Sequence, residues 1–454
     1  MSLDPHIRES PRVGRVDELV QWFRSRERPR EEWKVGLEHE KVPQKAGTLD
    51  PVPYAGAHGI AEALRAFGRF GYEPYLDEGQ VIAAQKRGLT VSIEPGGQLE
   101  LSGRPFQDVH AVAAELDRHL QKCRAIGEEL GIEFLATGYR PFGTPARAEW
   151  MPKARYVVMR PFLKARGARA EDMMAMTAST QVSYDFGSER DMAEKLRTAL
   201  AAQPAVVALY ANAPLVEGRP SGYKSFRSAV WEAVDPARSG LLPFAFEDGF
   251  ESEAYRCYTE WALDVPMVFL RRNDRYLETG GATFRAFLER GLEGAHPTLL
   301  DWEDHLSTLF PEVRLKGVIE VRGADSCDGP MTKALAALWK GILYDPEARR
   351  EAFALFDGLT VAERRALSLA AGGEGLSARL PGGRVLREVA ADLVAAASRG
   401  LCRQHCCGEK GQDERVWLEP LRARAASGRS PADEALEAFS RAGPRGLSGH
   451  LRIA

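Results

Sequence analysis

Polar and apolar residues alternate most clearly over residues 89–102, on both sides of a Pro-Gly-Gly turn. A period of two residues is typical of a β-strand, and glycine adopts the positive φ that a tight turn needs. The stretch therefore predicts a β-hairpin, with Glu94 before the turn and Glu100 after it. Two carboxylates brought close together repel each other unless a cation or a proton lies between them. This hairpin is a candidate metal site, and a solvated edge hairpin is the alternative.

Similar alternation predicts further strands at residues 34–40, 132–138, 178–186, 263–270 and 317–322. Apolar residues recurring every three to four positions predict helices at residues 14–30, 59–70, 108–130 and 189–203. Asp108 is suited to cap one of these helices and Gly131 to end it. Residues 160–169 are basic and irregular, which favours a loop. The pattern predicts an α+β fold in which helices flank an antiparallel or mixed sheet.

The character of the chain changes after about residue 331, where helical patterns follow one another. Thr360 and Ser430 begin sequences typical of helix N-termini. We therefore expect residues 1–330 to form a core and residues 331–454 a helical C-terminal section packed on it, as one integrated unit.

The charge of the 454-residue chain is nearly balanced, with 61 basic and 64 acidic residues and a net charge of −3. This balance offers no electrostatic reason to expect a nucleic-acid partner. No apolar run approaches the roughly 20 residues that cross a bilayer, and the N-terminus lacks the apolar stretch of a signal peptide. We expect no membrane partner and a cytoplasmic location.

Six cysteines in a chain of this length do not make a disulfide framework. Three of them cluster at residues 402–407, beside His405. A soft-metal site normally needs a second spaced pair of ligands. We therefore interpret the cluster as ordinary thiols at a helix end.

Several predicted strands carry oxygen-bearing side chains on one face. These candidates are Glu38, Glu40, Glu94, Glu100, Gln181 and Glu320. If the charged faces converge, carboxylates without cysteine ligands favour Mg²⁺ with a nucleotide over zinc. Each glutamate facing solvent is the alternative. The chain has no G-x-x-x-x-G-K-[ST] motif, so any use of ATP requires a fold other than the P-loop fold.

The chain resembles a known family, the plant-type glutamate–cysteine ligases of plants and many bacteria. The resemblance runs from about residue 33 into the helical C-terminal part. It rests on Gly36-Leu-Glu-His-Glu-Lys41, Ser92-Ile-Glu-Pro-Gly-Gly-Gln-Leu-Glu-Leu-Ser-Gly103, Met151-Pro-Lys-Ala-Arg-Tyr156, Thr180-Gln-Val-Ser-Tyr-Asp-Phe186, Ser225-Phe-Arg-Ser228 with Trp231, Ala262-Leu-Asp-Val-Pro-Met267, and the segment 310–325.

The resemblance implies a glutamine-synthetase-like core in which a curved antiparallel sheet forms a funnel. It implies that ATP and Mg²⁺ join L-glutamate to L-cysteine through a γ-glutamyl phosphate, the first step of glutathione synthesis. A carboxylate is a poor acyl donor, and phosphoryl transfer from ATP would give it a good leaving group. The protein would be a monomer or a homodimer.

The resemblance also implies roles for individual residues. Arg155 and Arg227 would bind the glutamate carboxylates, with Tyr156 and Trp231 beside the substrate. The metal ligands would be Glu38, Glu40, Glu94, Glu100, Gln181 and Glu320. Lys153 and Arg322 would contact the nucleotide, and Arg155, Arg227 and Arg322 would be the catalytic cations.

One feature of the family is missing. The plant enzymes carry a disulfide pair after the Asp-Val-Pro-Met segment, and alignment places Thr279 and about Gly294 at those positions. We therefore expect that redox switch to be absent. Other functions remain open from the residues alone: a ligase of the same fold with another amine acceptor, a metal-dependent hydrolase, and a non-catalytic binding protein.

Overall fold

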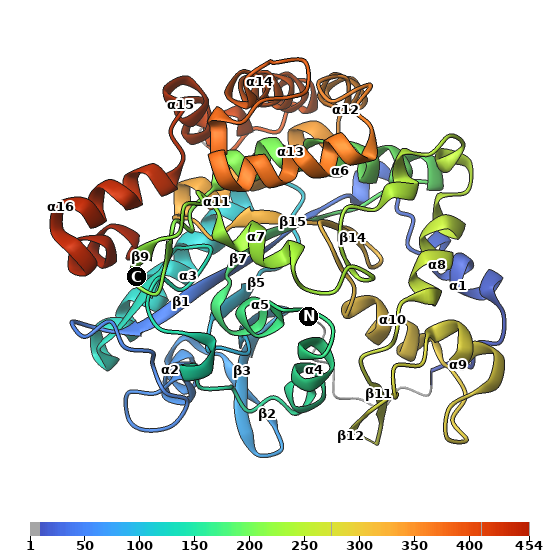
Figure 1. The fold of residues 1–454 in the computed structure, drawn as a ribbon, viewed down its shortest axis with the longest axis horizontal. Coiled ribbons are helices and arrows are strands. Elements are labelled where there is room, and N and C mark those ends of the chain that lie inside the picture. The colour runs from blue at the N-terminus through green and yellow to red at the C-terminus, as the bar shows by residue number, and fades with distance from the viewer. Residues whose placement is uncertain (1–9, 274, 410, 454) are drawn as a thin grey trace.

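A computed structural model describes residues 10–273, 275–409 and 411–453. At its centre is a nine-stranded antiparallel sheet with the order β14-β15-β7-β1-β5-β4-β3-β2, and β6 extends β1 (Figure 1). Its strands are β1 (Val35–Lys45), β2 (Glu73–Asp77), β3 (Gln80–Lys86), β4 (Leu89–Ile93), β5 (Leu99–Ser102), β6 (Ile132–Leu135), β7 (Ser179–Tyr184), β14 (Val313–Leu315) and β15 (Ile319–Asp325). The α+β prediction is confirmed, and the sheet is antiparallel rather than mixed.

Strand β1 is the axis of the sheet because its 11 residues pair with three other strands. Its first half lies between β5 and β7, and its second half pairs with β6. Along its first half the burial alternates, so that Leu37, His39 and Lys41 are fully or almost fully buried while Glu38 and Glu40 are partly accessible. The two faces of β1 therefore differ: one packs on helices, and the other carries the glutamates.

The predicted hairpin forms between β4 and β5. The Glu94 amide donates to the Gln98 carbonyl at 2.8 Å, and the Gly97 amide donates to the Glu94 carbonyl at 2.8 Å. Gly97 has φ +86°, and a Cβ on Gly96 would meet the carbonyl oxygen of Ala175 at 2.0 Å. Both glycines are thus required, one by backbone conformation and one by close packing.

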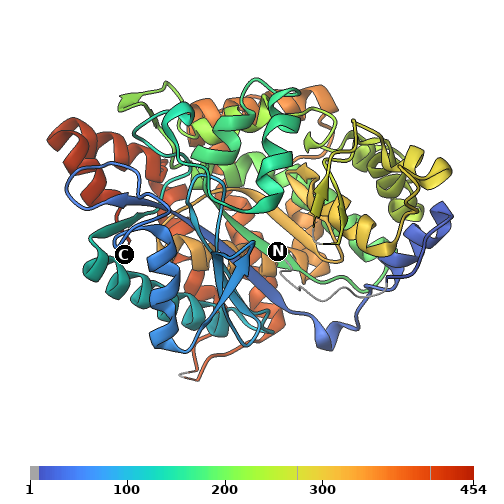
Figure 2. The same cartoon turned by 90° about the horizontal axis from the view of Figure 1, so that it is seen from below.

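Helices cover the sheet in two layers on the side opposite the glutamates. α3, α6 and α11 pack directly on the strands, and α12, α13 and α14 pack outside α6 and α11 (Figures 1 and 2). The helices are α1 (Val16–Arg24), α2 (Ile60–Ala66), α3 (Val109–Leu130), α4 (Ala154–Lys164), α5 (Ala170–Met176), α6 (Glu189–Tyr210), α7 (Phe226–Glu232), α8 (Ala254–Asp264), α9 (Phe284–Arg290), α10 (Leu299–Ser307), α11 (Gly329–Leu343), α12 (Pro346–Ala354), α13 (Val361–Glu374), α14 (Leu386–Gln404), α15 (Glu419–Ser427) and α16 (Pro431–Leu451).

Three short ribbons complete the fold: β8 (Leu215–Val216) with β9 (Arg219–Pro220), β10 (Ser239–Gly240) with β13 (Phe310–Pro311), and β11 (Leu270–Arg272) with β12 (Arg275–Leu277). Segments distant in sequence also meet, since α1 packs on α8 (Figure 1). α1 and α16 lie at opposite ends of the molecule (Figures 1 and 2). Within the described residues, we find no helix that is both long and apolar enough to cross a membrane.

The prediction for residues 108–130 is confirmed, because the Asp108 side chain accepts the Ala111 amide at 2.8 Å and Gly131 ends α3 with φ +65°. The predicted end of the helix at 203 is wrong, since α6 continues to Tyr210 through Pro204. The last two turns of α6 are buried on all sides. Packing on both sides there outweighs the hydrogen bond that proline removes.

Two other predictions of local structure are wrong. Residues 160–164 are not a loop but the end of α4, where Pro161 removes a bond to the exposed residue Val157, whose carbonyl water can satisfy. Residues 263 and 264 end α8, because Leu263 continues its buried helical face and Pro266 stops it. The strand begins at Leu270.

Candidate active site

A cavity of about 880 Å³ lies against the glutamate-bearing face of the sheet. All of the site residues predicted from the sequence line it except Glu320: the lining includes Glu38, Glu40, Glu94, Glu100, Lys153, Arg155, Tyr156, Gln181, Arg227, Trp231 and Arg322. These residues come from five strands and turns and from two helices. The sheet therefore brings together side chains that are spread over most of the first 322 residues.

Strand register explains how the acidic floor of this cavity is built. Glu40 lies directly opposite Glu100 on β5, and Glu38 lies opposite Gln181 on β7. Residues that are directly opposite in antiparallel strands point to the same face. Ser92 pairs with Glu100 in turn and donates its hydroxyl to Glu100 Oε2 at 3.1 Å.

Glu40, Glu94 and Glu100 form what we call the acidic trio. Burial, and then the charge of Glu94, raises the pKa of Glu40 to about 7, although Ser179 donates its amide to Glu40 Oε2 at 2.6 Å. Burial, and then Glu38 and Glu94, raises the pKa of Glu100 to about 8. The trio therefore concentrates negative charge that the surrounding protein leaves largely uncompensated.

Glu94 lies beside two groups from the start of α4. The Lys153 ammonium is 3.7 Å from Glu94 Oε1, beyond hydrogen-bonding distance, and neither atom has a hydrogen bond among the described residues. The Tyr156 hydroxyl donates to the Ile93 carbonyl at 3.2 Å and lies 3.4 Å from Glu94 Oε2. Burial lowers the pKa of Lys153, while Glu94 opposes this shift. A buried lysine and a partly accessible glutamate thus face each other without forming a hydrogen bond.

Glu320 is in a different position, which we call the Glu320 node. It is fully buried, and its Oε2 accepts Arg314 Nε at 2.8 Å and Arg322 NH1 at 2.7 Å. The Lys316 ammonium is 2.5 Å from Oε1. Burial alone would raise the pKa of Glu320, but the charges of Arg314, Lys316 and Arg322 hold it well below its usual value. Gln181 also accepts a hydrogen bond from Arg322.

Glu38 lies between these two regions. Burial would raise its pKa, but Lys316 and Arg314 outweigh burial and lower it. Glu38 therefore belongs electrostatically to the Glu320 node, although register places it on β1 beside Glu40.

The predicted substrate arginines lie in the walls of the cavity. Arg227 on α7 is 5% exposed and donates NH1 to the Gly323 carbonyl at 3.1 Å and NH2 to the Arg322 carbonyl at 2.8 Å. Its guanidinium lies 5.8 Å from the centre of the Trp231 ring. Arg155 lies at the start of α4, 5.5 Å from the ring of Phe269. The backbone thus holds Arg227 rigidly, and both arginines face the cavity.

Sequence reasoning missed several cavity residues. Arg314 lies in β14 and Lys316 directly follows it, two residues further on, so both point to the same side. This spacing could have identified them as cavity residues, although the pattern is very short. Arg271 and Asp304 also line the cavity, from β11 and α10. Burial raises the pKa of Asp304, opposed by Arg271 and Arg155. No local pattern marks these two residues, because distant segments bring them to the cavity.

The oxygen-only donor set of the acidic trio fits a hard cation. Raised pKa values at Glu40 and Glu100, and a buried Glu94 Oε1 without a hydrogen bond, are what carboxylates show when their counter-charge is missing. In the described part of the chain, no three acid, histidine or cysteine side chains are arranged to hold a metal by themselves. Mg²⁺ commonly takes one or two protein carboxylates and completes its shell with water and phosphate oxygens.

The six cysteines are free thiols, as expected, and none of them lines the cavity. An acidic floor beneath cationic walls, built on an antiparallel sheet, is the layout of a site for charged small molecules.

The family follows from comparison with known sequences. A family model described as glutamate–cysteine ligase family 2 (GCS2) matches residues 34–449. The chain belongs to this family and is an ATP-dependent ligase.

Named relatives agree with this membership. The chain is 40% identical over 428 residues to glutamate–cysteine ligase B, chloroplastic, of Oryza sativa subsp. japonica, covering 93% of this chain and 84% of the relative. It is 40% identical over 429 residues to the chloroplastic glutamate–cysteine ligase of Nicotiana tabacum (93% and 79%). It is 38% identical over 430 residues to that of Arabidopsis thaliana (93% and 80%). The predicted family is confirmed.

Among solved structures, the complex between the prokaryotic ubiquitin-like protein Pup and its ligase PafA is a distant match. The TM-score is 0.43 at 10% sequence identity, over 93% of this chain and 73% of that chain.

Proposed function

We propose that this protein joins L-glutamate to L-cysteine with hydrolysis of ATP to ADP and phosphate, the first step of glutathione synthesis. The family match over residues 34–449 carries this conclusion. The cavity supports it, because cationic walls suit a triphosphate and an amino acid with two carboxylates.

Arg155 and Arg227 are the proposed ligands of the glutamate carboxylates, since guanidinium groups pair with carboxylates in bidentate geometry. Arg227 is prepared for this task because two backbone carbonyls orient it, while its Nε has no hydrogen bond among the described residues. Trp231 and Tyr156 would flank the substrate, since both line the same cavity. Because its side chain is already fixed, Arg227 would lose little conformational entropy on binding the substrate.

Mg²⁺ is the proposed cation, with the acidic trio as its main ligands and Glu38 and Gln181 beside it. When bound, Mg²⁺ neutralises triphosphate charge and favours phosphoryl transfer. Glu320 was predicted as a ligand as well. In our proposal Glu320 instead orients the cations around it, because Arg314, Lys316 and Arg322 already occupy its oxygens.

Lys153 and Arg322 are the proposed contacts of the ATP phosphates. Phosphoryl transfer depends mainly on positioning and charge neutralisation, which fixed cations supply. Transfer of the γ-phosphoryl to the γ-carboxylate of glutamate would give an acyl phosphate, and attack by the neutral cysteine amine would release phosphate.

The test is ADP release with ATP, Mg²⁺ and glutamate, with and without cysteine, with the products weighed by mass spectrometry. Cysteine-dependent ADP and the mass of γ-glutamylcysteine are expected. The same assay with 2-aminobutyrate, a diamine and ammonia tests the acceptor, and a faster reaction with one of these would replace cysteine in the proposal. ATP-independent turnover would favour a hydrolase, and ligand binding without any ADP would favour a binding protein.

The proposal treats residues 1–330 and 331–454 as one catalytic unit, in the cytoplasm, as a monomer or a homodimer. Size-exclusion chromatography with light scattering measures the mass in solution, and a trimer or larger assembly would contradict a monomer or homodimer.

A further inference from the structure

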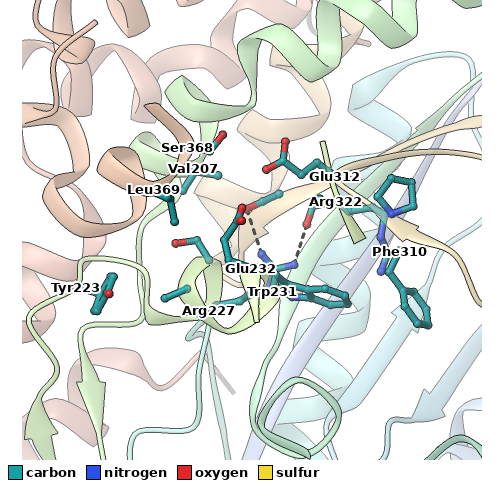
Figure 3. Close-up of a pocket in the computed structure, with 15 residues that line it drawn as sticks. Val207, Tyr223, Arg227, Trp231, Glu232, Phe310, Glu312, Arg322, Ser368 and Leu369 are labelled. Atoms are coloured by element: carbon teal, nitrogen blue, oxygen red, sulfur yellow. Dashed lines mark hydrogen bonds between the residues drawn. The ribbon is translucent and has the colours of Figure 1, made fainter. Parts of the chain in front are cut away.

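A second pocket lies behind one wall of the main cavity. Its free volume is about 50 Å³, and it shares Arg227, Trp231, Phe310 and Arg322 with the main cavity (Figure 3). About 10–15 Å³ of such space holds one water, so the pocket has room for roughly four waters or a ligand of about five non-hydrogen atoms. The pocket is small, but it is large enough for a specific ligand.

Apolar side chains form much of this second pocket. Val207 comes from α6, Leu369 from α13 and Phe310 from β13. Two large apolar side chains there are unusually exposed, Tyr223 by 38% and Leu369 by 51%. Tyr223 lies at the end of the pocket away from Phe310 (Figure 3). An apolar pocket that exposes aromatic and aliphatic groups favours a ligand with an apolar body.

The polar feature of the pocket is Glu312, between β13 and β14. Its amide donates to the Gly240 carbonyl at 3.0 Å, and its carbonyl accepts the Arg322 amide at 3.1 Å, so neighbouring strands hold its backbone. Its Oε2 atom is buried and has no hydrogen-bond partner in the described part of the chain. Burial, and then the charge of Glu232, raises the pKa of Glu312 to about 8. Both glutamates line this pocket.

The two arginines in the shared wall donate no hydrogen bond to Glu312 Oε2, although the charge of Arg227 partly lowers the pKa of Glu312. Arg227 donates to the carbonyls of Arg322 and Gly323 (Figure 3), and Arg322 donates to Glu320. Arg365 partly offsets the charge of Glu232. A buried carboxylate oxygen next to an apolar space is thus left without a hydrogen-bond donor.

We propose that the second pocket binds a small primary alkylammonium ion, whose ammonium group pairs with Glu312 and whose carbon chain contacts Val207 and Leu369. An ammonium group offers the hydrogen-bond donors that Glu312 Oε2 lacks, together with a positive charge that favours the ionised carboxylate. This inference goes beyond the ligase reaction and does not depend on it, because the residues that distinguish the second pocket are not among the proposed ligands of glutamate, ATP or Mg²⁺.

Isothermal titration of the full chain with n-butylammonium chloride at pH 8.5 tests the proposal. At this pH a primary amine is still largely charged, and Glu312 is mostly ionised. We expect binding at one site, and at least tenfold weaker binding of n-butanol, which has a similar shape without the charge. Absence of butylammonium binding, or equal binding of n-butanol, would overturn the proposal.

Variants locate the bound ion. Glu312→Gln keeps the shape of the side chain and removes its charge, so the affinity for butylammonium should fall at least tenfold. Leu369→Trp, at an exposed position, should also weaken binding by filling the pocket, and it tests the proposal even if the first variant fails to fold. Glu94→Gln, in the main cavity, is the matched control and should bind as the wild type does. Loss of binding in Glu94→Gln with retention in the other two would place the ion in the main cavity.

Discussion

The acidic trio and the Glu320 node both consist of glutamate carboxylates carried by the central sheet and its β4–β5 turn, yet they are opposite in electrostatic character. In the Glu320 node, Arg314, Lys316 and Arg322 bind a single carboxylate and lower its pKa. In the acidic trio, burial and mutual repulsion raise the pKa of Glu40 and Glu100. We infer from this difference that a glutamate carboxylate is available to a ligand only where no arginine or lysine of the protein already pairs with it.

Glu320→Gln should have the largest effect and should act on stability. Three cations would lose their shared anion, and removal of one partner from a buried ion pair costs about 3–5 kcal/mol. Urea denaturation measures the loss in the free energy of unfolding. Ser92→Ala, which removes a hydroxyl bound to Glu100 in the acidic trio, is the smaller control at about 1–2 kcal/mol. A Glu320→Gln protein as stable as the wild type would contradict the conclusion that the Glu320 node, unlike the acidic trio, is a stabilising cluster of ion pairs.

Glu94→Gln should act on activity rather than on stability. Turnover should fall by about 100-fold or more, the scale seen when one preorganised electrostatic group is removed. Its stability should stay close to that of the wild type, because Glu94 Oε1 has no hydrogen bond to lose and the glutamine side-chain oxygen can still accept the Tyr156 hydroxyl. ADP release at saturating glutamate and cysteine measures the first quantity, and urea denaturation the second. Activity within threefold of the wild type would remove Glu94 from the proposed metal ligands.

The pH dependence of stability should sharpen the comparison. Glu100 has a pKa of about 8 in the folded protein against an ordinary value of 4.5. Between these pH values the folded protein binds more protons than the unfolded chain, so this group makes the free energy of unfolding fall as pH rises. Without Mg²⁺, the Tm of Glu100→Gln should therefore fall less than that of the wild type between pH 5.5 and 8.5.

Mg²⁺ supplies the control for this measurement, since a cation bound to the acidic trio favours its ionised form. The rise in Tm on adding Mg²⁺ should be larger at pH 8 than at pH 5.5 in the wild type. Equal rises at both values would contradict cation binding by these carboxylates.

The smallest expected effect is that of thiol chemistry. Thr279, one of the two positions at which we expect the plant-type redox switch to be absent, donates its hydroxyl to the Met267 carbonyl at 2.6 Å, and no cysteine lines the main cavity. Activity after treatment with dithiothreitol or with a mild oxidant should therefore differ by less than about twofold, since neither reagent alters a group in the cavity. A large loss on mild reduction, measured by ADP release, would reveal a functional disulfide.

Much of the floor could be predicted from the sequence because alternation in a strand is a local signal. Glu94 and Glu100 are one turn apart, and the pattern of β1 identifies which of its residues face the cavity. The counter-charges could not be predicted in the same way. Arg314 meets Glu320 across the β14–β15 pairing, and Asp304 reaches the cavity from α10. Such contacts depend on tertiary packing rather than on the period of any segment.

The wrong element boundaries have the same origin. Pro204 normally signals the end of a helix, but α6 is buried between the sheet and the C-terminal helices, and burial on both sides outweighs that signal. At residues 263–270, a short apolar run fits a strand and a helix equally well, and Pro266 divides it between α8 and β11.

The pairing register of β1 also limits where residues can be inserted into this chain or deleted from it. Deletion or insertion of one codon near the start of β1 would turn Glu38 and Glu40 toward the helices and bring Leu37 and His39 into the cavity. Such frame-preserving changes would therefore abolish the site even though they alter no carboxylate. Length variation should be confined to exposed loops, such as residues 55–57, where an added residue leaves the pairing of every strand intact.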